Sequence, residues 1–183
     1  KQYTVLKQYE FDSHRATQSV IIEDVEGAKL IFVKGSPESS KDLCEPSSLP
    51  LSFDTSVREP AKTGIYKIAI ALRSFDLDIS MKDVSRDDVE KSLTFGGFIN
   101  FQNVMREETP GVIQELEEGD VTVAMITGDN VLTGICIARE AGMIKANRTV
   151  ILGRKASNTD IEWVDADRDA VVKDQTSFLM SSE

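Results

Sequence analysis

Val121 to Asn130 reads VTVAMITGDN, an apolar run that ends in four small or polar residues. The run is typical of a buried strand, and Val131 to Ala141, which follow it, have the apolar spacing of a helix. A strand that turns tightly into a helix places the free N–H groups and positive dipole end of that helix at the turn. Open α/β sheets bind their ligands at the carboxyl ends of such strands. We therefore expect a site for a Mg2+-phosphate group at Thr127-Gly128-Asp129-Asn130, where Thr127 offers a hydroxyl and Asp129 a carboxylate.

The segments around this run predict a helix-strand-helix-strand order. Thr109-Pro110 supplies an N-cap and a first-turn proline for a short helix that ends at Gly119. Asn130 is the expected cap of the next helix, and Gly142 is expected to end it. Residues 149–152 form a possible further strand, followed by a polar, irregular tail. This alternation is typical of a parallel α/β lobe.

The first half of the chain instead predicts antiparallel strands. The turn 24–27 between two apolar runs indicates a hairpin, and Gly96-Gly97 indicates a bulge or a close approach of the backbone. Pro37 is expected to open a short helix. Residues 45–64 are expected to form a long loop with room for one helical turn, and residues 76–90 a polar linker or insertion. The predicted strands are residues 4–9, 19–22, 29–33, 66–72 and 93–101.

The predicted fold class is therefore α/β, with two lobes. Residues 1–102 are expected to form an α+β lobe with an antiparallel sheet and helices. Residues 103–183 are expected to form part of a parallel α/β lobe.

Composition excludes several classes of partner and site. The 183 residues have a formal net charge of −10, which repels nucleic acid and anionic membrane surfaces. No run reaches the roughly 20 apolar residues of a membrane helix, and because the chain starts at Lys1 we expect it to be an internal piece of something larger. Cys44 and Cys136 are expected to be reduced thiols, and His14, the single histidine, is expected to be a surface residue. No metal-ligand cluster is expected.

Two further motifs are weak when taken alone. Lys34-Gly35 stands at the end of a predicted strand, where a surface lysine before a glycine turn is common. Phe11 is the kind of residue that is usually part of a core. The Asp129 and Asn130 pair is likewise frequent as turn and cap residues. Their order along the chain is more informative than any one of them.

That order resembles the cytosolic nucleotide-binding and phosphorylation region of P-type ATPases, over roughly residues 9 to 145. The short gap before the Lys-Gly motif and the sequence after Asn130 are most similar to the fifth class, which is linked to polyamines and cations. The matching motifs, in order, are Phe11 with Ser19-Val20, Lys34-Gly35-Ser36-Pro37-Glu38, Gly64 with Ile68-Ala69-Ile70-Ala71, Leu93-Thr94-Phe95-Gly96-Gly97, and Met125-Ile126-Thr127-Gly128-Asp129-Asn130.

The resemblance implies roles for these residues in binding ATP and Mg2+. Phe11 would stack on adenine, Lys34 would line the nucleotide pocket, and Gly35 would let the backbone approach. Ile68 and Lys67 of the following strand would belong to the same pocket. Such phosphoryl transfers need mainly positioning and charge neutralisation.

In the second lobe, the resemblance gives the Thr-Gly-Asp-Asn loop the phosphoryl chemistry. Thr127 would hydrogen-bond the transferring phosphoryl group, and Gly128, Asp129 and Asn130 would hold the nucleotide phosphates and magnesium. That lobe would be part of a haloacid-dehalogenase-like α/β fold.

Some positions depart from the family pattern. The family arginine that reaches the phosphates falls on Tyr66, and a basic or amide position falls on Ala16. Arg15 or Lys67 compensating for these changes is a hypothesis. The motifs Asp-Lys-Thr-Gly-Thr, with the aspartyl nucleophile, and Gly-Asp-Gly-x-Asn-Asp are absent from the chain. We therefore expect the chain alone to bind ATP weakly and to be inactive.

The implied parent is an ATP-driven cation or polyamine pump that works through an aspartyl-phosphate. Its partners would be the remaining phosphorylation, actuator and transmembrane domains, and this chain would be a cytosolic domain of an integral membrane protein that is not itself inserted in the membrane. Two alternatives stay open: a haloacid-dehalogenase-like phosphatase that uses the same Thr-Gly-Asp loop, and a non-catalytic nucleotide-binding or interaction module.

Overall fold

The structure is a computed structural model that describes residues 2–76, 78–157 and 160–172. The chain divides into two compact units, one from the N-terminus to Asn103 and one from Val104 onward. The end of the expected irregular tail, residues 173–183, lies outside the described residues.

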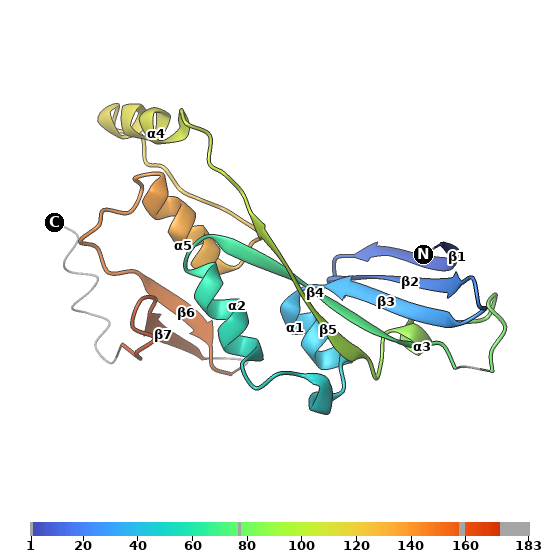
Figure 1. Ribbon diagram of the computed structural model, residues 1–183. Coiled ribbons are helices and arrows are strands. Elements are labelled where there is room, and N and C mark those ends of the chain that lie inside the picture. The colour runs from blue at the N-terminus through green and yellow to red at the C-terminus, as the bar shows by residue number, and fades with distance from the viewer. Residues whose placement is uncertain (1, 77, 158–159, 173–183) are drawn as a thin grey trace. The chain divides into compact units, whose positions relative to one another are not determined.

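The first unit is built on one five-stranded antiparallel sheet in which each strand pairs with the one before it (Figure 1). The expected antiparallel lobe with helices is thereby confirmed. The strands are longer than their apolar runs because pairing continues into the polar residues at both ends. They are β1 (Tyr3–Asp12), β2 (Thr17–Asp24), β3 (Lys29–Gly35), β4 (Ile65–Ser74) and β5 (Thr94–Gln102).

The hairpin between β2 and β3 forms at the predicted turn. The Asp24 carboxylate accepts hydrogen bonds of 2.9 Å from the backbone N–H groups of Glu26 and Ala28. Gly27 has φ of 85°, a left-handed conformation that favours glycine. The aspartate and the glycine together therefore fix the register of the hairpin.

The two faces of the sheet differ in burial. Alternate residues such as Ile21, Ile31 and Val33 are fully buried and pack with Val89 and Leu93 in the core. Their neighbours Val20 and Phe32 are only partly buried and point the other way. We call the first side the covered face and the second the open face. The helix α1 (Pro37–Leu43), which begins at the predicted proline, contacts β3 and β4.

The double glycine of β5 makes the expected bulge. Ile70 pairs with Gly97 and Ala71 with Phe95, so Gly96 is an extra residue in the ladder. A Cβ on Gly96 would lie 2.8 Å from Leu72 Cδ2 and 3.2 Å from the Ile70 carbonyl oxygen. Both readings of the motif, the bulge and the close approach, therefore hold.

The expected loop over residues 45–64 is wrong in its main part. It contains a 3-10 turn, η1 (Pro46–Ser48), and a helix of two and a half turns, α2 (Phe53–Ala61). Phe53 is buried against Phe95 and Phe98, with ring centroids 5.1 and 5.0 Å apart. Pro60 stands in the last turn of α2. Tertiary packing of the aromatic side chain overrides the polar, proline-rich local sequence.

The expected linker over residues 76–90 also contains structure, the short helix α3 (Arg86–Val89). Ser85 and Asp88 cap it reciprocally, each side chain bonding to the backbone N–H of the other. Val84 and Val89 beside them are buried in the core.

The described residues of the second unit form two helices and one hairpin. The helices are α4 (Thr109–Glu118) and α5 (Val131–Glu140), both where the sequence predicts them, although the cap residue of α4 is Glu108 rather than Thr109. The hairpin pairs β6 (Ile151–Lys155) with β7 (Ile161–Asp165), so the strand expected at 149–152 lies slightly later and the following tail is less irregular than expected.

The strand expected at Val121–Ile126 is not formed. These residues have no regular secondary structure, and Ile126 is 97% exposed. A strand that is apolar on both sides requires neighbouring strands on either side, and the two strands described in this unit pair with each other. The parallel, haloacid-dehalogenase-like lobe therefore stays a prediction.

Cys44 and Cys136 are both free, as expected. Within residues 2–76, 78–157 and 160–172, no helix has the length and apolar character that crossing a membrane requires.

Candidate functional site

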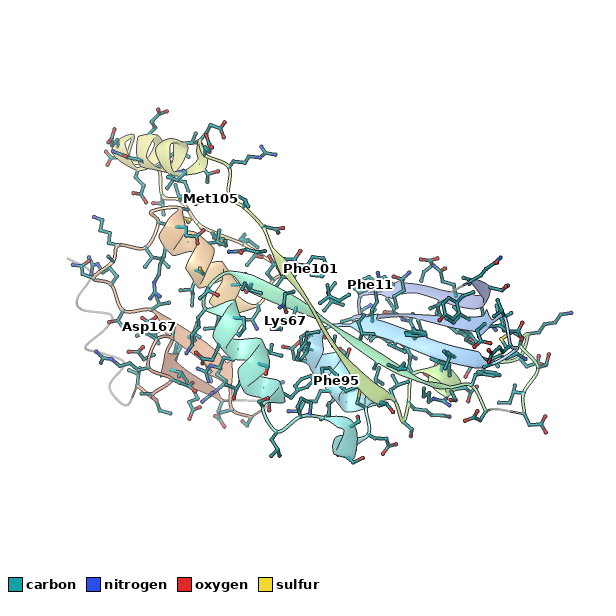
Figure 2. The ribbon with its side chains drawn as sticks, in the orientation of Figure 1. Phe11, Lys67, Phe95, Phe101, Met105 and Asp167 are labelled. Atoms are coloured by element: carbon teal, nitrogen blue, oxygen red, sulfur yellow. The ribbon has the colours of Figure 1, made fainter. Side chains whose placement is uncertain are left out.

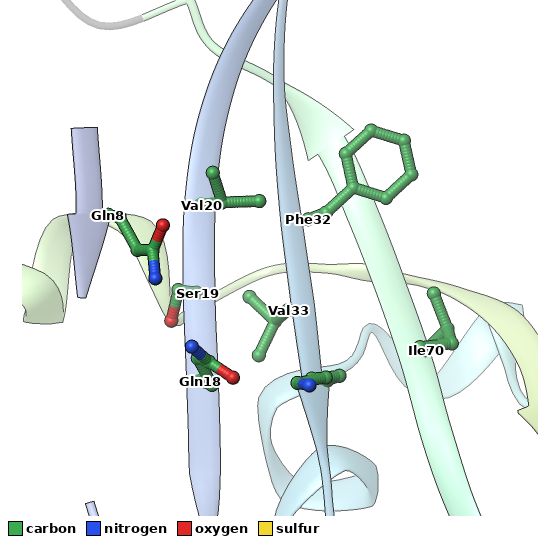
Figure 3. Close-up of a pocket in the computed structure, with 8 residues that line it drawn as sticks. Gln8, Gln18, Ser19, Val20, Phe32, Val33 and Ile70 are labelled. Atoms are coloured by element: carbon green, nitrogen blue, oxygen red, sulfur yellow. The ribbon is translucent and has the colours of Figure 1, made fainter. Parts of the chain in front are cut away.

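A depression of about 300 Å³ lies on the open face of the sheet in the first unit. Side chains from four neighbouring strands surround it, as Figure 3 shows for Gln8, Val20, Phe32 and Ile70. Backbone and side-chain atoms of Gln18, Ser19, Val33 and Lys34 complete the lining. The depression thus combines an apolar floor with two amides and one ammonium group.

Lys34 is the cation of this depression. It pairs across the sheet with Gln18 on β2 and with Ile70 on β4, which places all three side chains on the open face. Lys34 is exposed, and its ammonium group has no hydrogen-bond or ion-pair partner among the described residues. An anionic ligand could therefore reach it without displacing another group.

Phe11 reaches the open face through an irregularity in β1. Tyr9 pairs with Ser19 and Asp12 pairs with Thr17, so Glu10 and Phe11 together stand opposite Gln18. Such a bulge changes the face on which the following side chain emerges. Phe11 is 63% exposed, and it lies near the end of β1 (Figure 2). It does not line the depression itself, but it shares a face with Lys34.

Glu10 and two glutamines form a polar group between Phe11 and Lys34. Gln8 Nε2 donates to Glu10 Oε1 at 2.9 Å, and Gln18 Nε2 donates to Glu10 Oε2 at 3.4 Å. These glutamines are not among the residues that the sequence predicts for the site. Once β1 and β2 are paired, their alternation with apolar residues would have indicated them.

Gly35 allows the end of β3 to lie close to the backbone of the turn before β2. A Cβ at this position would lie 2.6 Å from the Ala16 carbonyl oxygen and 2.8 Å from Thr17 Cγ2. The same carbonyl accepts a hydrogen bond from the Ser36 N–H at 3.0 Å. Glycine is therefore required here because the turn between β1 and β2 approaches the end of β3.

Ile68 and Lys67 lie on opposite faces of the sheet. Ile68 is two residues from Ile70 on the open face. Lys67 lies on the covered side, where its Nζ donates to Asn100 Oδ1 at 2.6 Å and stands 5.2 Å from the centre of the Phe98 ring. The structure thus brings Ile68 together with Lys34 and does not bring Lys67 there.

Arg15 is engaged elsewhere. Its guanidinium forms ion pairs with Asp87 at 2.6 Å and with Glu90 at 3.5 Å, beside α3. The hydrogen bond and charge of Asp87 raise the pKa of Arg15 above its ordinary value. Neither residue proposed to compensate for the missing family cations therefore adds charge to the depression.

The Thr-Gly-Asp-Asn loop belongs to the second unit and is exposed throughout. Thr127 Oγ1 accepts a hydrogen bond of 3.0 Å from the Asp129 N–H. Asn130 caps α5, because its Oδ1 accepts a hydrogen bond of 2.9 Å from the Leu132 N–H. The predicted cap is confirmed. Gly134 of α5 approaches this turn, since a Cβ there would lie 3.3 Å from Thr127 Cγ2.

The donor set of the loop fits only part of a magnesium site. Asp129 is its one carboxylate, and the described residues contain no cluster of three or more side chains that could hold a metal ion. Mg2+ commonly binds through one or two carboxylates together with phosphate oxygens of a substrate. The loop can therefore fit Mg2+ only when the ion arrives bound to phosphate.

Comparison with known proteins identifies similar sequences along most of the chain. Residues 1–108 match the family described as P-type ATPase, cytoplasmic domain N. The chain is 32% identical over 164 residues to the probable cation-transporting ATPase 13A4 of Mus musculus, which covers 87% of this chain and 14% of that protein.

Two further relatives agree with this. The polyamine-transporting ATPase 13A3 of Homo sapiens is 31% identical over 172 residues, 89% of this chain and 14% of the relative. The vacuolar cation-transporting ATPase YPK9 of Saccharomyces cerevisiae is 35% identical over 150 residues, 80% of this chain and 10% of the relative. The chain thus spans about a seventh or less of the length of these proteins.

Proposed function

The chain belongs to the P-type ATPases, and from this membership we propose that its first unit binds ATP on the open face of the sheet. In this proposal the parent protein is an ATP-driven cation or polyamine pump. The observation that supports this most directly is the depression around Lys34. It lies within the residues that match cytoplasmic domain N. Its apolar floor, amides and free ammonium group suit a ligand with a flat ring and an anionic tail.

In this proposal, Phe11 and Lys34 bind opposite ends of the nucleotide. The exposed Phe11 ring stacks on the adenine, where base–aromatic stacking contributes about 1–3 kcal/mol. The Lys34 ammonium approaches a phosphate group. Ile68 extends the apolar surface on the same face, and Gly35 keeps the end of β3 close to the neighbouring turn.

The exposed loop of the second unit is proposed as a separate phosphoryl-binding element of the parent protein. Thr127 would donate a hydrogen bond to the transferring phosphoryl group once its hydroxyl is turned to the ligand. Gly128 and the N–H groups before α5 would approach the phosphates, and Asn130 would hold the start of the helix. Asp129 would bind Mg2+ that ATP brings with it.

The parent protein is proposed to hydrolyse ATP through an aspartyl-phosphate and to move a cation or polyamine. This rests on the printed names of the relatives, which are cation-transporting or polyamine-transporting ATPases. The chain would then act as a cytosolic domain of a membrane protein, with further phosphorylation, actuator and transmembrane domains as its partners. The assignment of residues 103–183 to a partial phosphorylation domain belongs to the same proposal.

Calorimetric titration of the 183-residue chain with ATP tests the binding step. Phe11→Ala should weaken binding by about five-fold to a hundred-fold, because it removes the stacking surface. Lys34→Ala should weaken it by about five-fold or less, as expected for an exposed ion pair. Lys29→Ala is the matched control, because Lys29 lies at the opposite end of the same strand.

Two outcomes would count against the proposal. Binding that is unchanged in both variants would place the nucleotide elsewhere. A wild-type chain that folds but binds no ATP at millimolar concentration would favour the non-catalytic interaction module. Circular dichroism of each variant separates these results from loss of folding.

A further inference from the structure

The open face of the sheet is nearly devoid of positive charge. Of the described residues in the five strands, the other lysines and arginines point to the covered side. Lys7 Nζ donates to the Met81 and Val84 carbonyls, at 3.0 and 2.8 Å. Arg73 Nη2 donates to the Asp88 carbonyl. Lys67 also has a covered-face position, where it contacts Asn100. The same holds for Lys29, which stands opposite Glu23 of β2. Lys34 is therefore the one cation on the open side of the described strands.

The rest of this face is mainly apolar and aromatic. Phe11, Ile99 and Phe101 are 63%, 47% and 38% exposed. Tyr66 and Phe101 stack with ring centroids 5.3 Å apart and an angle of 16° between the rings. Tyr66 on β4 and Phe101 on β5 are direct cross-strand partners. The face therefore offers much contact area to a flat ring and little to a chain of phosphates.

The charged groups near Lys34 are unfavourable to added negative charge. Glu10 stands on the same face, held by the side-chain amides of Gln8 and Gln18. Gln18 is also the cross-strand neighbour of Lys34. The whole chain has a formal net charge of −10, which repels polyanions more strongly as their charge rises.

We propose that this site selects its ligand by the nucleoside and is nearly indifferent to the number of phosphates. Its ligand class would be adenosine nucleotides in general, including the monophosphate and the nucleoside itself. The inference rests on the proposed function, since it assigns the specificity of the same open-face site. A single exposed ion pair, which Lys34 can form, changes a dissociation constant by about five-fold or less.

The test is a calorimetric series on the 183-residue chain with adenosine, AMP, ADP and ATP, without Mg2+ and at low ionic strength. We expect the four dissociation constants to lie within about five-fold of one another. ATP binding that is more than ten-fold tighter than AMP binding would overturn the inference while leaving the proposed function intact. Absence of ATP binding would overturn both.

Two variants and a control sharpen the result. Lys34→Ala should remove the remaining difference between ATP and AMP, because no cation is then left on this side of the described strands. Ile68→Lys places a second lysine on the open face, at the position diagonal to Lys34 across β3 and β4. Such diagonal positions lie about 7–8 Å apart. This variant should raise the ratio of the AMP to the ATP dissociation constant. Lys29→Ala should leave that ratio unchanged.

The added cation also distinguishes this inference from a general weakness of the site. If Ile68→Lys binds all four ligands as the parent chain does, phosphates do not lie near Lys34 and the inference fails. If the ratio rises while adenosine binding stays the same, lack of charge is what makes the parent site indifferent.

Discussion

Glu90 is a buried carboxylate on the covered side of the sheet. Its side chain is 1% exposed. Arg86 Nε donates to it at 2.8 Å, Thr17 Oγ1 donates at 3.1 Å, and the Ser19 hydroxyl donates as well. Arg86 Nη2 also donates a hydrogen bond of 2.6 Å to the Thr17 carbonyl oxygen. The group therefore joins α3 to β2 on the covered side, directly behind Gln18.

Glu90→Gln should destabilise the first unit by about 3 kcal/mol, because it removes the charge of a buried carboxylate that pairs with the Arg86 guanidinium, whose side chain is 17% exposed. Urea unfolding followed by circular dichroism measures this loss. Glu59→Gln is the control, since Glu59 is exposed and pairs with Lys62 on the surface; its effect should stay below about 1 kcal/mol. Equal, small effects of both substitutions would show that the cluster contributes little.

At the residue scale, the sequence indicates the face of the sheet for some of the expected site residues and leaves it open for others. Lys34 could be assigned because a lysine before a glycine at a strand end has one allowed face once the strand is fixed. Lys67 could not be excluded, because its face depends on the pairing of β4 with β3 and β5, which local sequence does not specify. The two glutamines were missed for the same reason.

Helix α3 depends on a cap that titrates. The Ser85 hydroxyl and the Ser85 N–H both donate to the Asp88 carboxylate, at 2.6 and 3.1 Å. These bonds, with help from Lys91, lower the pKa of Asp88 below its ordinary value of 3.8. A carboxyl whose pKa is lowered by folding adds stability that is present above the unfolded pKa and is lost as pH falls through the folded pKa.

We therefore expect the free energy of unfolding to fall as the pH is lowered below about 4, and part of that fall to disappear in Asp88→Asn. Chemical unfolding at a series of pH values from 7 to 2.5 measures the slope. Asp83→Asn, a nearby exposed aspartate, is the control. A slope that is the same in Asp88→Asn and in the parent chain would contradict the role of the cap.

Helix α2 depends on one aromatic side chain. Phe53 is 4% exposed and contacts both Phe95 and Phe98. Phe53→Ala should cost about 3–5 kcal/mol, because it removes the buried ring and leaves a cavity. Thermal or urea unfolding of the variant measures this.

Leu51→Ala is the matched control for that substitution, because Leu51 is fully exposed two residues earlier. It should change stability by less than about 0.5 kcal/mol. If the two variants unfold alike, α2 is held by its backbone rather than by the aromatic contact.

At the scale of elements, periodicity identifies the strands and fails where packing decides. The antiparallel sheet, α1, α4 and α5 follow from apolar spacing and from caps at Pro37, Gly119 and Asn130. Helix α2 could not be predicted, since its polar sequence becomes helical only against β4 and β5. The strand at Val121–Ile126 was predicted from an apolar run, but no described neighbour supplies its hydrogen bonds.

The whole chain consists of two units of different character. The first has the larger sheet and the larger buried core, and the second exposes much of its apolar sequence. The match to cytoplasmic domain N ends at residue 108, close to the boundary at Asn103. Resemblance of ordered motifs could predict this family because each motif keeps its place along the chain.

A chain of residues 1–103 should fold without the rest. We expect one cooperative unfolding transition and the same adenosine affinity as the 183-residue chain, since every residue of the depression lies before Asn103. Nuclear magnetic resonance spectra of the two chains should overlay for the strand residues. A spectrum of 1–103 that lacks dispersed amide signals would show that the second unit is needed for folding.

The neighbour-to-neighbour order of the strands has a consequence during synthesis. The first three strands are complete at Gly35, so both hairpins can form while the ribosome is still elongating the chain. Their inner side, with Ile21, Ile31 and Val33, is closed only when Val89 and Leu93 arrive. A nascent chain that stalls between Gly35 and Leu93 exposes the apolar side of these three strands to solvent. Chaperones are therefore most needed during this interval of synthesis.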